Sequence, residues 1–190
     1  YYDTGVGKTR VGAGIIATYP QDGWTVVTPR SVFPAWFEEL ARWGVPCWTP
    51  VGHYHKKQWK QKVSPEPNGG VLIVTPQTLA LDRHWKHLRP YIGALVVDES
   101  SVLCNPKAKI TRRLWGIRNA LERVYLLSGS PSPQGPLWLW GQAELLGAHV
   151  GGWWRWANEF GTQIQIPGRK GGPWRLRPGA EARILRMLAY

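Results

Sequence analysis

The chain has 190 residues, of which 43% are hydrophobic and 19% are charged, and its formal net charge at pH 7 is +12. This composition excludes a disordered chain, favours one domain with a smaller appendage, and contains no apolar run long enough to span a membrane. Its two cysteines, Cys47 and Cys104, are too few for a disulfide framework and favour reduced thiols in a cytoplasmic protein. The positive charge, with a pI of about 10.1, favours a polyanionic partner, nucleic acid first.

The first element is a glycine-containing loop that ends in Gly7-Lys8-Thr9. Gly5 and Gly7 allow the backbone N–H groups to point inward, where a phosphate would meet them and the positive end of the following helix. Lys8 would reach the β- and γ-phosphates of a nucleotide, and the Thr9 hydroxyl would ligate Mg²⁺. The full phosphate-loop pattern needs a glycine where Tyr2 stands, so an ordinary glycine-rich turn is the alternative.

The residues after this loop predict a helix that packs on a sheet, because Val11, Ile15 and Ile16 recur among small residues. A phosphate loop lies between a strand and a helix, and only two residues precede Asp3. The only methionine is Met187. We therefore expect a fragment whose first strand is truncated.

Strands and helices then alternate. Short apolar runs bounded by glycine and proline predict strands over residues 24–28, 47–51, 71–75, 93–97 and 124–127. Apolar residues at spacings of three and four predict helices over residues 31–41, with Ser31 as cap, 76–88, 108–121 and 136–146. This alternation predicts an α/β fold with a parallel sheet that binds ligands at the carboxyl ends of its strands.

The composition changes near Gly147 to tryptophan, glycine, proline and arginine. We therefore expect one domain over residues 1–147 and a mostly helical appendage over 148–190. Within the appendage, helices are expected over 153–160 and 180–188, with an irregular stretch over 166–179.

Two features of the composition leave alternatives open. The basic, aromatic-bearing stretch 53–62 is either a solvated helix face or a patch that contacts phosphates. The 13 tryptophans could stack on bases, but most stand at helical spacing beside apolar residues, which favours core packing.

Two acidic residues follow the strand expected over 93–97. Asp98 would hold Mg²⁺ through its water shell, and Glu99 would act as general base on the attacking water. Two acids after an apolar run are common. Combined with Gly7-Lys8-Thr9 roughly ninety positions earlier, they predict a nucleotide-hydrolysing site.

Five segments in order resemble the motifs of the first RecA-like domain of superfamily two helicases, and more narrowly of Swi/Snf-type DNA translocases. Motif I is matched by Asp3-Thr4-Gly5-Val6-Gly7-Lys8-Thr9. Motifs Ia, Ib, II and III are matched by residues 26–31, 75–79, 97–101 and 127–131, and residues 105–112 resemble a marker of these translocases. The resemblance covers residues 3–160, and the segment after motif III is similar to that of distant bacterial and viral members.

The resemblance implies a RecA-like parallel sheet and the ATP-binding half of a DNA-dependent ATPase that moves along duplex DNA without necessarily separating its strands. ATP and Mg²⁺ are the implied cofactors, and a second RecA-like domain is an implied partner. The implied site residues are Asp3, Thr4, Gly5, Val6, Gly7, Lys8 and Thr9 for the nucleotide, Thr9 and Asp98 for Mg²⁺, Lys8, Asp98 and Glu99 for catalysis, Ser128, Gly129 and Ser130 for coupling, and Arg30, Thr75 and Gln77 for DNA.

The chain departs from the family pattern in informative ways. Ser100-Ser101 replaces the usual Ala-His of motif II, which puts the coupling between nucleotide and motif III in doubt. Ser128 and Ser130 replace threonines and keep their hydroxyls. The family's adenine-recognition segment and its arginine finger have no counterpart in these residues. Because an arginine finger contributes on the order of 10³–10⁵ in rate, we expect very slow turnover by this chain alone.

Two other functions compete with this interpretation. A nucleic-acid-binding module with a decayed nucleotide site is disfavoured because Lys8, Thr9, Asp98 and Glu99 are all retained. A small-molecule P-loop kinase is disfavoured because the chain lacks a lid arginine pattern, and because it leaves motifs Ia and III unexplained.

Overall fold

The computed structural model describes residues 7–50, 70–148, 150–167 and 172–188. Their contacts divide the chain into two compact units. The first comprises residues 1–100 and 119–129, and the second comprises residues 101–118 and 130–190. Each unit has its own hydrophobic core and is described by itself.

The first unit is built on a five-stranded parallel sheet, as the alternating pattern predicts. The strands are β1 (Trp24–Val27), β2 (Cys47–Trp48), β3 (Val71–Val74), β4 (Ala94–Asp98) and β5 (Arg123–Leu127). Their order in the sheet is β2-β3-β1-β4-β5. The strands β1, β3 and β4 are buried at every position, and apart from Thr25 in β1 and Asp98 at the end of β4 their residues are apolar, as expected for parallel strands covered on both faces.

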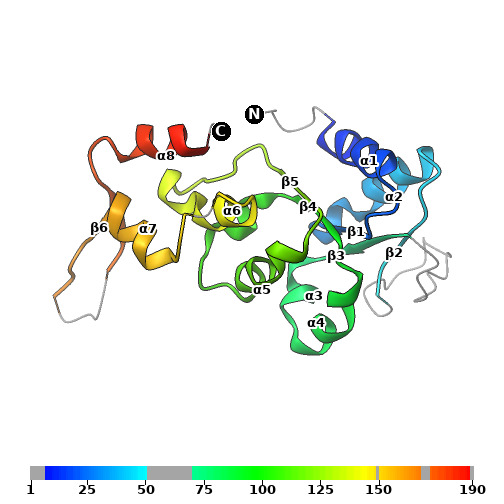
Figure 1. Ribbon diagram of the computed structural model, residues 1–190, viewed down its shortest axis with the longest axis horizontal. Coiled ribbons are helices and arrows are strands. Elements are labelled where there is room, and N and C mark those ends of the chain that lie inside the picture. The colour runs from blue at the N-terminus through cyan, green and yellow to red at the C-terminus, as the bar shows by residue number, and fades with distance from the viewer. Residues whose placement is uncertain (1–6, 51–69, 149, 168–171, 189–190) are drawn as a thin grey trace. The chain divides into compact units, whose positions relative to one another are not determined.

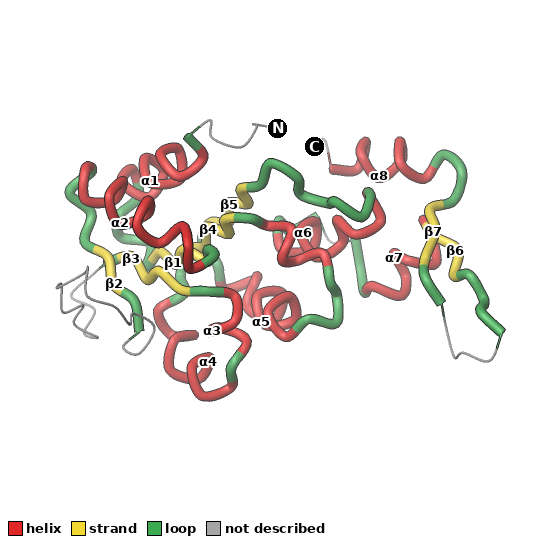
Figure 2. The backbone as a smooth tube through the Cα atoms, turned by 180° about the vertical axis from the view of Figure 1, so that it is seen from behind, coloured by secondary structure: helices red, strands yellow, loops and turns green. Residues whose placement is uncertain are grey.

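Helices cover both sides of this sheet. Figures 1 and 2 show α1 and α2 on one side, and α3 and α4 on the other. The bounds are α1 (Lys8–Thr18), η1 (Arg30–Val32), α2 (Phe33–Arg42), α3 (Pro76–Ala80), α4 (Asp82–Leu88) and η2 (Arg89–Tyr91). Alternate strand residues pack with α1 and α2 in one core, which includes Ala13, Ile16, Trp24, Val26, Phe33, Trp36, Leu40, Val71, Ile73, Ala94 and Val96.

Three local expectations in this unit are wrong. Ser31 does not cap α2, which begins at Phe33 after the turn η1. Val11 is 54% exposed, so α1 packs through Gly12, Ala13 and Ile16 instead. The helix expected over 76–88 is two helices, because Leu81 is extended, with φ −87° and ψ 129°.

The second unit is mostly helical and has an aromatic core. Its elements are η3 (Ser100–Cys104), α5 (Lys109–Ile117), η5 (Pro136–Leu139), α6 (Trp140–Leu145), α7 (Trp153–Phe160), β6 (Gly161–Gln163), β7 (Trp174–Leu176) and α8 (Ala180–Leu188), while η4 (Arg118–Ala120) links the two units along the chain. Trp140 and Trp156 are almost fully buried, whereas Trp154 is 58% exposed. Burial of these two indole rings agrees with the preference for core packing over base stacking.

A strand pair in this unit corrects the sequence interpretation. Residues 166–179 are predicted to be irregular, but β7 lies among them and pairs antiparallel with β6, as Figure 2 shows. Thr162 lies opposite Arg175 in this pair. Strands of three residues are too short to produce an alternating pattern, so their pairing depends on tertiary contacts.

The second unit also buries a carboxylate. The Glu144 side chain is 1% exposed, and it forms an ion pair with Arg118 and accepts a hydrogen bond from Trp115 Nε1 at 2.9 Å. Its other oxygen, Oε1, has no hydrogen-bond partner among the residues that the structure describes. No helix in the described part of the chain is long and apolar enough to cross a membrane.

Candidate nucleotide site

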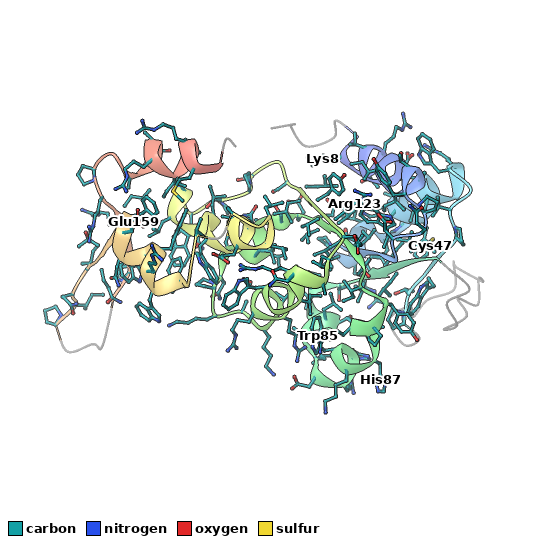
Figure 3. The ribbon with its side chains drawn as sticks, viewed as in Figure 1. Lys8, Cys47, Trp85, His87, Arg123 and Glu159 are labelled. Atoms are coloured by element: carbon teal, nitrogen blue, oxygen red, sulfur yellow. The ribbon has the colours of Figure 1, made fainter. Side chains whose placement is uncertain are left out.

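The carboxyl ends of the parallel strands bring several predicted site residues to one edge of the sheet. Thr28 follows β1, Thr75 follows β3, Asp98 ends β4, and Ser128 follows β5. Helix α1 leads into the start of β1, so its first residue, Lys8, lies toward this same edge (Figure 3). Ligands bind at this edge in open α/β sheets.

The first turn of α1 has the geometry of an anion site. Gly7 is the N-cap, with φ 85° and ψ 25°, a left-handed conformation that suits glycine. Among the described residues no side chain caps this helix end, and the N–H group of Val11 donates to Gly7 O at 3.0 Å. The N–H groups of the first turn form the positive end of the helix dipole, which favours a phosphate. Asp3, Thr4, Gly5 and Val6 lie outside the described residues.

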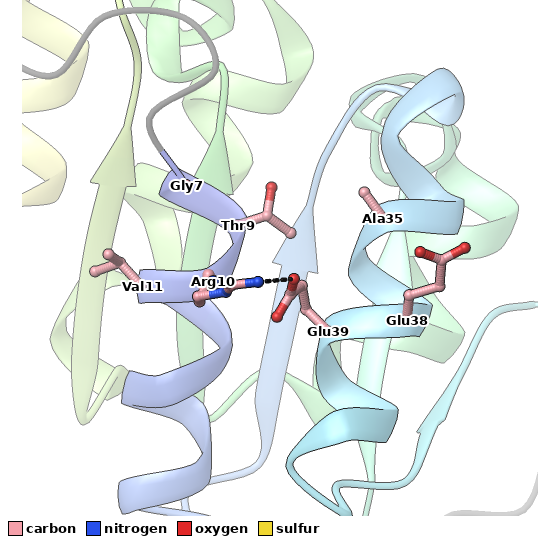
Figure 4. A pocket seen from close by; sticks show the side chains of 7 residues that line it. All are labelled: Gly7, Thr9, Arg10, Val11, Ala35, Glu38 and Glu39. Atoms are coloured by element: carbon pink, nitrogen blue, oxygen red, sulfur yellow. Dashed lines mark hydrogen bonds and ion pairs between the residues drawn. The ribbon is translucent and has the colours of Figure 1, made fainter.

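A pocket of about 480 Å³ lies beside this turn, between α1 and α2 (Figure 4). Across it, Arg10 of α1 forms an ion pair with Glu39 of α2 at 3.5 Å, and within α2 Arg42 forms a second ion pair with Glu39 at 2.7 Å. The carboxylates of Glu38 and Glu39 disfavour a phosphate inside the pocket, so phosphates are expected at the backbone of the first turn. The pocket is lined by Gly7, Thr9, Arg10, Val11, Ala35, Glu38 and Glu39.

Asp98 is 5% exposed and is held by two neutral donors. Thr28 Oγ1 donates to Asp98 Oδ2 at 3.0 Å, and Trp36 Nε1 donates to the same oxygen at 2.9 Å. No hydrogen bond to Oδ1 is found among the described residues. The sequence does not predict these contacts, because it indicates Thr28 only as a strand residue and Trp36 only as part of an apolar helix face.

Glu99 has an unusual backbone conformation. Its φ is 57°, and it is the only non-glycine residue with positive φ in the part of the chain that the structure describes. Strained conformations of this kind cluster at functional sites. The side chain accepts a hydrogen bond from Ser128 Oγ at 3.4 Å, so the segment after β5 contacts the carboxylate that follows β4. Gly129 and the exposed Ser130 come next in the chain.

The donor set suits a magnesium ion that is shared with a nucleotide. Within the described residues, no group of three or more His, Cys, Asp or Glu side chains is arranged to hold a metal ion. Mg²⁺ commonly keeps several waters and binds one or two carboxylates together with substrate phosphates. One carboxylate, Asp98, and one hydroxyl, Thr9, therefore fit Mg²⁺ with ATP.

The three residues expected at DNA differ in exposure. Arg30, on η1, and Gln77, on α3, are exposed. Thr75 is 8% exposed and caps α3, accepting from Thr78 N at 3.1 Å. The basic stretch 53–62 lies outside the described residues.

Comparison with known proteins gives a consistent result. The SNF2-related domain matches residues 3–188. The chain is 32% identical over 142 residues to the Bos taurus SWI/SNF-related matrix-associated actin-dependent regulator of chromatin subfamily A-like protein 1, covering 74% of the chain and 14% of that protein. It is 27% identical over 146 residues to the Arabidopsis thaliana ATP-dependent DNA helicase DDM1, covering 72% of the chain and 19% of that protein.

Among solved structures, the Sulfolobus solfataricus SWI2/SNF2 ATPase core in complex with dsDNA shares the fold, with a TM-score of 0.56 and 22% identity. That match covers 83% of this chain and 33% of the other. The chain thus spans a third or less of each of these relatives. Because the family match extends over residues 3–188, the chain belongs to the SNF2-related domain family.

Proposed function

We propose that the chain is the ATP-binding half of a DNA-dependent ATPase, and that it couples ATP hydrolysis to movement on duplex DNA when joined to a second RecA-like domain. The observation that carries this proposal is the presence of Asp98 and Glu99 at the end of β4, at the edge of the sheet toward which α1 begins. In this proposal, residues 1–147 form the RecA-like domain and residues 148–190 form the appendage that leads to the second domain.

The proposed chemistry assigns phosphate binding, Mg²⁺ binding and proton transfer to separate groups. The N–H groups of the first turn of α1 and the Lys8 ammonium bind the phosphates, together with residues 3–6 of the loop. Thr9 and Asp98 hold Mg²⁺, which when bound neutralises charge on the β- and γ-phosphates. Glu99 accepts a proton from the attacking water, and the hydrogen bond from Ser128 helps to orient its carboxylate.

The proposed DNA contacts lie on the segments that follow β1 and β3. Arg30 and Gln77 are exposed there and can bind phosphates without reading bases. Thr75 contributes by capping α3, which fixes the backbone beside Gln77. The net charge of +12 supports a polyanionic partner.

The nucleotide part is tested with Lys8→Ala. Removing the ammonium leaves phosphate charge uncompensated, a loss of charge-assisted hydrogen bonds worth about 1.5–3 kcal/mol each, or at least about tenfold in affinity. Isothermal titration with Mg²⁺ and the slowly hydrolysed analogue ATPγS measures the dissociation constant. Lys107→Ala, at an exposed lysine of the second unit, is the matched control and is expected to bind like the parent. Equal affinities of Lys8→Ala and the parent would contradict the proposal.

The DNA part is tested by the salt dependence of duplex binding. Each phosphate contact adds about 0.9 to the slope of log affinity against log salt concentration. Arg30→Gln is expected to lower the slope by about that amount. Arg42→Gln removes an equal charge from a side chain paired with Glu39 and serves as the control. If both variants keep the parental slope, Arg30 does not contact DNA.

A further inference from the structure

The proposed magnesium ligand Asp98 is held by two groups that the proposed chemistry does not use. The Thr28 hydroxyl and the Trp36 indole N–H both donate to Oδ2, at 3.0 Å and 2.9 Å. Thr28 and Trp36 are each fully buried, and both belong to the segment that follows β1. Two donors on one oxygen fix the rotation of the carboxylate and leave Oδ1 as the oxygen that can accept from another partner.

Packing against α1 also restricts the Trp36 ring. A Cβ atom at Gly12 would lie 2.5 Å from Trp36 Cη2, so the absence of a side chain at Gly12 makes room for the indole beneath α1. The ring therefore lies between the helix that begins at Lys8 and the carboxylate of Asp98. Close packing against Gly12 therefore opposes rotation of the indole N–H away from Asp98.

Trp36 differs from Trp24, the other tryptophan in the same core, in the group that accepts a hydrogen bond from its indole N–H. Trp24 is 2% exposed and donates its N–H to the backbone carbonyl of Tyr19 at 2.7 Å. A backbone carbonyl and a carboxylate can each accept a hydrogen bond from a buried indole N–H group. The need to pair this group therefore does not by itself explain the carboxylate acceptor of Trp36. Hydrogen bonds to an ionised acceptor are about twice as strong as those between neutral groups, which suits them to orienting that acceptor.

We propose that Trp36 and Thr28 are positioning residues for Mg²⁺: they hold Asp98 Oδ2 so that Oδ1 faces the water shell of the ion. This inference rests on the proposed function, because it concerns the metal of the same nucleotide site. Groups that orient a metal ligand typically change metal affinity or activity by about 10–100-fold when they are removed.

The test measures how much Mg²⁺ improves nucleotide binding. Isothermal titration gives the dissociation constant of ATPγS in excess Mg²⁺ and in EDTA, and the ratio of the two is the magnesium gain. Trp36→Phe, which keeps most of the ring volume, and Thr28→Val, which removes only the hydroxyl, are each expected to lower the gain by about tenfold. Thr28→Ser keeps a hydroxyl at this position and, unlike Thr28→Val, is expected to keep most of the magnesium gain. Affinity in EDTA is expected to stay at the parental value, because the phosphate loop is unchanged.

Trp24→Phe is the matched control. Trp24→Phe makes the same substitution in the same core, but Trp24 does not contact Asp98. It is therefore expected to lower the melting temperature by a similar amount and to keep the parental magnesium gain. Binding of Mn²⁺, followed by electron paramagnetic resonance with ATPγS present, gives the affinity of the ion itself. It is expected to weaken in Trp36→Phe and not in Trp24→Phe.

The outcomes separate this inference from the proposed function. If the parent and Trp24→Phe show a magnesium gain and Trp36→Phe and Thr28→Val show the same gain, the positioning role is wrong and the proposed function stands. An equal loss of gain in Trp24→Phe and Trp36→Phe would also overturn it, because the effect would then come from core packing. If the parent binds no ATPγS, the proposed function and this inference fall together.

Discussion

The left-handed backbone of Glu99 predicts an unusual response to substitution. At φ 57°, an L-residue costs about 1–2 kcal/mol, and glycine avoids this cost. Glycine also has more backbone freedom in the unfolded chain, which lowers the free energy of unfolding by about 0.5–1 kcal/mol relative to alanine. Glu99→Gly is therefore expected to be more stable than Glu99→Ala by about 0.8 kcal/mol, within a range of about 0–1.5 kcal/mol, or roughly 2–3 °C in melting temperature for a chain of this size. Both variants lose the hydrogen bond from Ser128, so this contact cancels in the comparison.

The assay is thermal unfolding followed by circular dichroism, with urea unfolding as a second measurement. Glu38, an exposed residue inside α2, is the matched control. In a helix interior glycine is about 1 kcal/mol less favourable than alanine, so Glu38→Gly is expected to be less stable than Glu38→Ala. The order of the two variants should thus reverse between position 38 and position 99. If alanine is equal to or better than glycine at both positions, Glu99 is not strained.

Three further predictions concern single side chains. In the chain joined to a second RecA-like domain, Glu99→Gln is expected to keep the parental affinity for ATPγS and to lower single-turnover ATP hydrolysis by about 10²–10⁴-fold, because an amide cannot accept the proton; unchanged hydrolysis would remove Glu99 from the role of base. Arg118→Ala is expected to cost about 3–5 kcal/mol in urea unfolding, since it leaves the buried Glu144 carboxylate without its cation, and adding Glu144→Gln should recover part of that loss. Burial raises the pKa of the Cys47 thiol to about 11, so its alkylation at pH 8, followed by mass spectrometry, should be about a hundredfold slower in the folded than in the unfolded chain. Because the unfolded thiol ionises first, the same shift makes stability fall as pH rises above about 9.

The sheet could be predicted from the sequence because its signal is local and strong. Continuous apolar runs such as 71–75 and 93–97 have few other stable placements than a doubly covered parallel strand. The predicted strands therefore agree with β3 and β4 to within one residue at each end. The hairpin of β6 and β7 has no such signal, since its three-residue strands depend on each other for hydrogen bonding.

The site was only partly predictable, for a physical reason. The spacing of Gly7-Lys8-Thr9 and Asp98-Glu99 reflects chemistry that needs particular residue types, so the sequence displays it directly. The donors to Asp98 come from Thr28 and Trp36, 70 and 62 residues away in the chain. Such contacts follow from how α2 packs on the sheet, and no local pattern distinguishes an indole that donates to a carboxylate from one that donates to a carbonyl.

A crystal structure of the chain with ATPγS and Mg²⁺ would test the proposed nucleotide site most directly. We expect the β- and γ-phosphates to lie at the N–H groups of the first turn of α1, within reach of Lys8. Mg²⁺ is predicted between the phosphates, the Thr9 hydroxyl and the Oδ1 side of Asp98. Phosphates bound elsewhere on the surface, or an ion that does not involve Asp98, would contradict the proposed site.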